Sequence, residues 1–128
     1  ASREAYVVEV AAICTTQAAQ LAEVDVPTEG TLDQVATENR AAAAILEQTV
    51  EDLKALDPPR STDTTAYLDF RRQLISLAHT AEDSAEAATT VDSTRLAELT
   101  AEYDELRQTM TGGPAESGLE ECLASLPS

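Results

Sequence analysis

The sequence predicts an all-α protein: an antiparallel up-down four-helix bundle with a short C-terminal helical segment that folds back. Apolar residues recur at alternating spacings of three and four over four long segments, which is the period of one helix face. Stretches that contain Gly or Pro separate these segments. No segment shows the sustained polar and apolar alternation of a strand. The 128 residues fit a single domain, 1–128.

The composition indicates an aliphatic core. Apolar residues make up 43% of the chain, aromatic residues only 3%, and there is no Trp. Leu, Val, Ile and Ala must therefore fill the interior. Such residues suit helix-on-helix packing, because Ala allows helices to approach and Leu fills the remaining space.

The first helix is expected from about Arg3 to Val24. Its buried face, broadened by Val7 and Cys14, comprises Tyr6, Val10, Ile13, Gln17, Leu21 and Val24. Residues 25–30 end this helix, because Pro27 lacks a backbone N–H and Gly30 tolerates turn conformations.

The second helix is expected to begin at a Thr28 or Thr31 cap and to end near Leu56. Its face, broadened by Ile45 and Val50, comprises Leu32, Val35, Asn39, Ala42, Leu46, Thr49, Leu53 and Leu56. This spacing is typical of a helix in a bundle. Pro58 and Pro59 form the strongest helix break in the chain.

A cap at Ser61, Thr62 or Asp63 is expected to start the third helix, which ends before a turn at 89–92. Its face comprises Tyr67, Phe70, Leu74, Leu77, Ala81, Ser84 and Ala88. Because the last turns of this face narrow to Ala and Ser, we expect that end of the bundle to be either tightly packed or frayed.

The fourth helix is expected to start after Asp92 or Ser93 and to end at Gly112-Gly113-Pro114. Its face comprises Leu96, Leu99, Tyr103, Leu106 and Met110. A last helical segment is expected from Pro114 to about Leu126, because Pro favours the first position of a helix.

Cys14 and Cys122 are the two cysteines, and both fall at apolar positions. They form either a disulfide or two buried free thiols, which are common in cytosolic proteins. The fold-back of the tail after Gly112-Gly113, along the groove between the first and fourth helices, favours the disulfide. Two Cys and one His at these spacings match no zinc pattern, and there is no C-x-x-C redox motif.

The charge excludes two classes of partner. The formal net charge is −16, from 24 acidic and 8 basic residues. Nucleic acids repel such a surface, so no nucleic-acid binding is expected. Anionic membranes attract clusters of basic residues, and the longest basic run here is Arg71-Arg72, so no direct binding to them is expected.

No catalytic site, metal site or cofactor is predicted, so the protein is not expected to be an enzyme. Nucleophilic catalysis needs a nucleophile, a base and an orienting group, but the single histidine, His79, falls on the outward side of the third helix. The many carboxylates also fall mainly on outward positions, where they serve solubility.

A small pocket between the helices is the one binding site that the sequence suggests. Three tyrosines lie on the buried faces of three helices, with hydroxyls that can reach the surface. Asn39 either fixes the register of the second helix or lines this pocket. The candidate pocket residues are Tyr6, Asn39, Tyr67 and Tyr103.

Three motifs carry a resemblance to exported helical domains of actinobacterial lipoproteins and membrane-anchored proteins. They are Cys14 in an early helix; Leu53-x-x-Leu56-x-Pro58-Pro59 followed by Tyr67-x-x-Phe70; and Ala115-x-x-Gly118-Leu119-x-x-Cys122. Together they span most of the chain. The resemblance implies an envelope or extracellular location and a Cys14–Cys122 bridge, but no activity and no catalytic residue.

These observations favour a non-enzymatic, exported module of the cell envelope that acts through contacts with another envelope protein. A small-ligand carrier with an apolar pocket between the helices is the alternative. The chain has no run of about 18 apolar residues that would span a bilayer. Its first residues lack the apolar region of a signal peptide, so we expect any signal or anchor to lie upstream.

Overall fold

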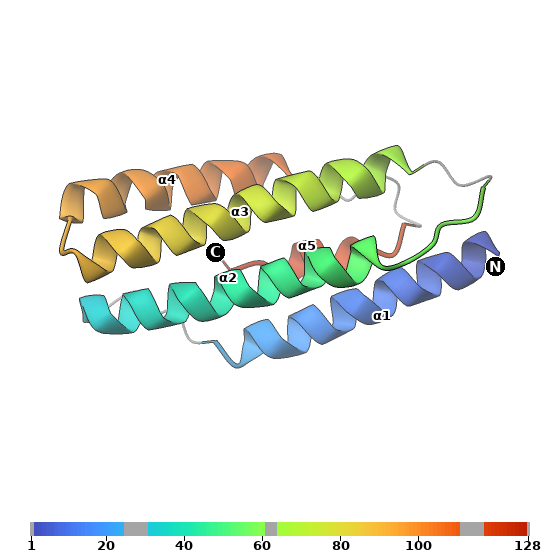
Figure 1. The fold of residues 1–128 in the computed structure, drawn as a ribbon, viewed down its shortest axis with the longest axis horizontal. Helices are drawn as coiled ribbons and strands as arrows, with labels where there is room; N and C mark the ends of the chain where they lie inside the picture. Colours follow the sequence, from blue (N-terminus) through green and yellow to red (C-terminus); the bar gives the residue numbers. More distant parts are fainter. Residues whose placement is uncertain (1, 25–30, 61–63, 111–116, 128) are drawn as a thin grey trace.

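The computed structural model describes residues 2–24, 31–60, 64–110 and 117–127 (Figure 1). Its helices are α1 (Arg3–Ala22), α2 (Leu32–Lys54), α3 (Thr65–Thr89), α4 (Ser93–Thr109) and α5 (Glu120–Ala124). The described residues include no strand, so the predicted all-α class is confirmed. The four long helices pack against one another in a way that fits a bundle.

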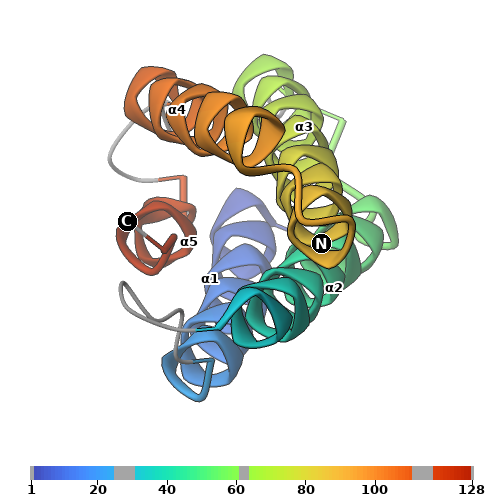
Figure 2. The ribbon, with the colours of Figure 1, turned by 90° about the vertical axis from the view of Figure 1, so that its left-hand side faces the viewer.

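The helices pack mainly with their neighbours in sequence. Helix α3 packs against both α2 and α4, and α1 packs against α2 and α5. Consecutive long helices run in opposite directions in Figure 1. Viewed from one end, α5 lies between α1 and α4 (Figure 2), so the short C-terminal helix, not α4, covers the free side of α1.

Side-chain caps start three of the helices. The hydroxyl of Ser2 accepts a hydrogen bond from the Ala5 N–H, and the Asp92 carboxylate accepts one from the Arg95 N–H. Thr31 and Gln34 form a reciprocal capping box at the start of α2, which agrees with one of the two predicted caps. The other, Thr28, and the predicted α3 caps at 61–63 lie outside the described residues.

The core follows the predicted helix faces, although Leu96, Tyr103 and Leu106 of the predicted α4 face are only partly buried. The largest fully buried side chains are Phe70, Leu46, Leu74, Leu77, Leu99, Leu119, Gln17, Val10, Cys14 and Cys122. A smaller cluster of Ala36, Ala85 and Ala88 lies near the α3–α4 turn. There the small side chains are buried, which is the tightly packed outcome of the two expected for that end of α3.

The C-terminal segment differs from its prediction. A helix was expected from Pro114 to about Leu126, but α5 covers only Glu120–Ala124, and Pro114 lies outside the described residues. Gly118 has a φ of +89°, which a continuous right-handed helix cannot contain. Other differences are small: α1 and α2 each end two residues earlier than expected, at Ala22 and Lys54.

No helix in the described part of the chain is both long enough and apolar enough to cross a bilayer.

Candidate functional site

A buried disulfide holds the C-terminal tail against α1. The Cys14 and Cys122 sulfurs are bonded at 2.06 Å, and both residues are fully buried, so the predicted bridge is confirmed. Nearby, Gln17 Nε2 donates to the Cys122 carbonyl oxygen at 3.0 Å and to Ser125 Oγ at 3.1 Å. The bridge and these two bonds place α5 on the free side of α1.

The segment before α5 is docked by a close backbone contact. A Cβ atom at Gly118 would lie 2.7 Å from the Val7 carbonyl oxygen, so only glycine allows the tail to approach α1 this closely. The Leu119 N–H donates to Ser117 Oγ at 3.2 Å, which stabilises the turn. The Tyr67 hydroxyl donates to the Ser117 carbonyl oxygen at 2.8 Å and ties the tail to α3.

Tyr67 forms a pair with Tyr6 of α1. The ring centroids are 5.1 Å apart and the ring planes are nearly perpendicular, an edge-to-face arrangement that aromatic rings prefer. Both tyrosines are buried, and burial raises the pKa of each hydroxyl. Arg71 opposes this rise in the pKa of Tyr6.

One face of the tyrosine pair lines an open pocket of about 260 Å3, which we call the tyrosine pocket. The pocket lies at the end of the bundle where α1 and α3 begin and α2 ends, on the right in Figure 1. Its lining consists of Tyr6, Leu53, Lys54, Leu56, Pro58, Thr64, Tyr67, Leu68 and Arg71. Apolar and aromatic groups therefore dominate, with two cations among them.

A shallow groove of about 780 Å3, here the link groove, continues from this pocket. It shares Leu56 and Pro58 with the tyrosine pocket. Its other lining residues are Glu9, Ala55, Asp57, Pro59 and Arg60. Together the two hollows follow the connection between α2 and α3.

The structure places the other two candidate pocket residues elsewhere. Asn39 is half-buried in the first half of α2, and its side-chain nitrogen donates to the Val35 carbonyl oxygen one turn earlier. Tyr103 lies on α4 with its hydroxyl buried and without a hydrogen-bond partner in the described part of the chain. Burial raises the pKa of Tyr103 to about 12, although Arg107 acts in the opposite direction. Neither residue lines the tyrosine pocket.

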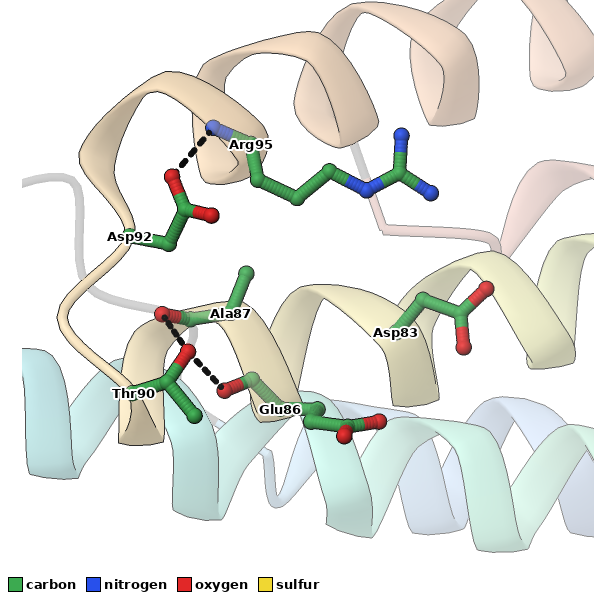
Figure 3. Close-up of a pocket in the computed structure, with 6 residues that line it drawn as sticks. All are labelled: Asp83, Glu86, Ala87, Thr90, Asp92 and Arg95. Atoms are coloured by element: carbon green, nitrogen blue, oxygen red, sulfur yellow. Dashed lines mark hydrogen bonds between the residues drawn. The ribbon is translucent and has the colours of Figure 1, made fainter.

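A third hollow, of about 310 Å3, lies beside the α3–α4 turn (Figure 3). Asp83, Glu86, Ala87, Thr90, Asp92 and Arg95 line it. The polar groups near the turn serve helix ends: the Thr90 hydroxyl donates to the carbonyl oxygens of Glu86 and Ala87, and the Asp92 carboxylate caps α4. The Arg95 guanidinium pairs with Glu98 at 3.6 Å. These contacts assign Thr90 and Asp92 to helix ends and Arg95 to a surface ion pair.

One contact between acidic groups crosses the α2–α3 interface. Glu47 of α2 lies beside Glu82 of α3, and His79 lies close enough to oppose the rise in the pKa of Glu47. The pKa of Glu47 is raised mainly by partial burial. A side-chain hydrogen bond with Glu82 and repulsion from the same carboxylate raise it further. His79 is exposed on α3, on the outward side. Across residues 2–24, 31–60, 64–110 and 117–127, no group of His, Cys, Asp and Glu could hold a metal ion.

Sequence reasoning identified Tyr6 and Tyr67 but missed the side chains that complete the pocket. Arg71 follows Tyr67 by four residues, which places both on the same side of α3. Lys54 is the last residue of α2, next to the buried Leu53. The i, i+4 spacing of Tyr67 and Arg71 could have identified the arginine from the sequence. The contribution of Lys54 could not be identified in this way, because it depends on how α2 packs against α3.

The fold and the site define a helical bundle with a disulfide-held tail and a small, partly cationic pocket at one end. A comparison of the chain with protein-family models, with curated proteins and with solved structures finds no match.

Proposed function

We propose that this protein is a non-enzymatic, exported module that binds another protein of the cell envelope through the tyrosine pocket and the link groove. In this proposal, residues 1–128 form one domain. The domain is an antiparallel up-down four-helix bundle, and the folded-back tail covers α1.

The shape and lining of the tyrosine pocket carry the proposal. Tyr6 and Tyr67 line the pocket and are buried, while Leu68, which also lines it, is 42% exposed. Protein interfaces concentrate binding energy where a large side chain enters such a pocket. The link groove extends the surface along the α2–α3 connection, as contact with a longer segment of a partner requires.

An envelope or extracellular location is part of the proposal. The Cys14–Cys122 disulfide is compatible with an extracellular location, because disulfides form and persist in oxidising compartments. The resemblance to exported actinobacterial domains supports the same location. The net charge of −16 opposes nucleic acids and anionic membranes as partners.

A non-enzymatic role is supported by the position of the one histidine. His79 is exposed on α3, far along that helix from the tyrosine pocket at its beginning. A general base must lie within hydrogen-bond reach of the group that it deprotonates. The buried cysteines are joined in the disulfide and therefore are not nucleophiles.

Site-specific photo-crosslinking tests the proposal. A photoreactive amino acid replaces Leu68, at the pocket, or His79, an exposed position farther along the same helix. We expect a discrete crosslinked protein from intact cells at position 68 but not at position 79. Unlabelled protein added as a competitor should reduce the crosslink at position 68, and unlabelled protein with the Leu68→Glu change should not. Equal labelling at both positions would contradict the proposal.

The alternative is a small-ligand carrier. Typical small-molecule pockets have volumes of roughly 300–1,000 Å3, so the tyrosine pocket, at about 260 Å3, is closer in size to a site for one inserted side chain. Native mass spectrometry of the purified protein would support a carrier if one stoichiometric organic ligand copurified.

A further inference from the structure

The charge of the tyrosine pocket contrasts with that of the chain as a whole. Among the residues that the structure describes, Lys54 and Arg71 are the charged members of its lining, and no carboxylate lines it. The chain as a whole carries 24 acidic and 8 basic residues. The link groove, by comparison, includes the carboxylates of Glu9 and Asp57. The tyrosine pocket is thus a local cationic site on an acidic protein, which favours an anionic group.

Arg71 is placed to bind such a group. Its guanidinium makes no ion pair within the part of the chain that the structure describes, although it lies near the Tyr6 hydroxyl. Its neighbour Arg72, by contrast, pairs with Asp69 at 3.7 Å and does not line the pocket. A guanidinium presents two parallel N–H donors that match the two oxygens of a carboxylate.

Lys54 adds a second, more mobile cation. Its ammonium lies 3.6 Å from the Glu51 carboxylate, and both side chains are more than half exposed. An ion pair with this exposure is weak, so a ligand carboxylate can compete for the ammonium. The pocket also includes Thr64, the residue that precedes α3. The positive end of the α3 dipole therefore acts in the same direction.

We propose that the tyrosine pocket binds an acidic, apolar segment of the partner protein, with one large apolar side chain in the pocket and an adjacent carboxylate on Arg71 and Lys54. The apolar side chain contacts Leu53, Leu68 and the tyrosine rings. This inference rests on the proposed function, because it specifies the chemistry of the segment that docks there. Binding energy comes from the apolar group, and the two cations select the acidic neighbour.

Three short peptides test this chemistry with the full, disulfide-bonded protein. Each is an acetylated tetrapeptide amide: one with phenylalanine followed by aspartate, one with lysine replacing the aspartate, and one with serine replacing the phenylalanine. Binding is followed through the amide NMR signals of Tyr6, Leu53, Tyr67 and Leu68. The experiment is run at 0.15 M salt, where the screening length is about 8 Å, so that contacts within the pocket persist while general repulsion is reduced.

We expect the phenylalanine-aspartate peptide to shift these signals and the lysine peptide to bind about fivefold more weakly. This comparison is stringent, because the overall charge of −16 by itself favours the lysine peptide. Arg71→Gln should weaken the aspartate peptide about fivefold and leave the lysine peptide unchanged. Arg72→Gln, with the same change in net charge, should have no effect.

Two other results would overturn the inference in different ways. If the aspartate and lysine peptides bind equally, or if the changes at positions 71 and 72 act alike, the charge preference is wrong while the pocket remains a docking site for apolar groups. If the serine peptide shifts the same signals as strongly as the phenylalanine peptides, the apolar anchor is wrong. That outcome overturns the proposed function as well.

Discussion

The Tyr67 hydroxyl donates a hydrogen bond of 2.8 Å to the Ser117 carbonyl oxygen, which joins α3 to the C-terminal tail across 50 positions of sequence. The same tyrosine ring packs edge-to-face on Tyr6 and lines the tyrosine pocket. One side chain therefore connects the tail, α1 and the proposed docking surface. Loss of its hydroxyl tests this connection without removing the ring.

Tyr67→Phe is expected to lower the free energy of unfolding by about 1 kcal/mol, because a buried hydrogen bond is lost. The melting temperature should fall by about 4 °C in a domain of this size. Tyr103→Phe is the matched control, because the Tyr103 hydroxyl is buried without a hydrogen-bond partner among the described residues. Its removal should be neutral or stabilising. Equal destabilisation by both changes would contradict the assignment of the Tyr67–Ser117 bond.

The disulfide is expected to resist reductant while the protein is folded. Both sulfurs belong to fully buried residues, so dithiothreitol should expose thiols only when guanidinium is added; thiol titration with and without denaturant measures this. The Cys14→Ala/Cys122→Ala double variant should lose about 3–5 kcal/mol of stability, because the bridge closes a long loop. Rapid reduction of the folded protein would show that the tail opens readily.

Gly118→Ala is expected to destabilise the protein by about 2 kcal/mol or more. The backbone has a φ of +89° there, and the new Cβ would lie 2.7 Å from the Val7 carbonyl oxygen. Urea denaturation measures the loss. Ala124→Gly on the exposed side of α5 is a control for a change of one methyl group in the tail, and its cost should be about 1 kcal/mol or less. A silent Gly118→Ala change would contradict the close contact between tail and α1.

Glu47→Gln is expected to stabilise the protein at neutral pH. The pKa of Glu47 is raised in the folded state, so the folded protein binds this proton more tightly than the unfolded chain does. The associated stability is present at low pH and is lost as the pH rises through the folded pKa, where Glu47 ionises beside Glu82. Replacement by Gln should therefore add about 0.5 kcal/mol at pH 7.5 and little at pH 4.

Urea denaturation at the two pH values measures this difference. Glu38→Gln removes one negative charge from the same helix and serves as the control for net charge. A gain from Glu47→Gln that is equal at both pH values, or no larger than that from Glu38→Gln, would show that repulsion between Glu47 and Glu82 does not limit stability.

The sequence by itself determined the four long helices and most of the positions that they bury. Thr31 and Asp92 mark helix starts through their side-chain caps, and the periodic positions from Tyr67 to Ala88 are buried as their spacing predicts. These features are local, because capping and helical period depend on residues within a few positions of one another. The two cysteines also indicated the bridge, since both fall at apolar positions and the expected fold-back of the tail brings them together.

Only the tertiary structure decided which buried faces meet. The period of a helix shows which side is buried but not which neighbour covers it, so the spacing placed Tyr6, Asn39, Tyr67 and Tyr103 together as candidates. Packing joins Tyr6 to Tyr67, leaves Asn39 bonded within α2 and buries Tyr103 on α4. The fold-back at Gly118 similarly depends on close contact with the α1 backbone, more than one hundred positions earlier in the chain. Such contacts are set by how whole helices fit together, which no short stretch of sequence encodes.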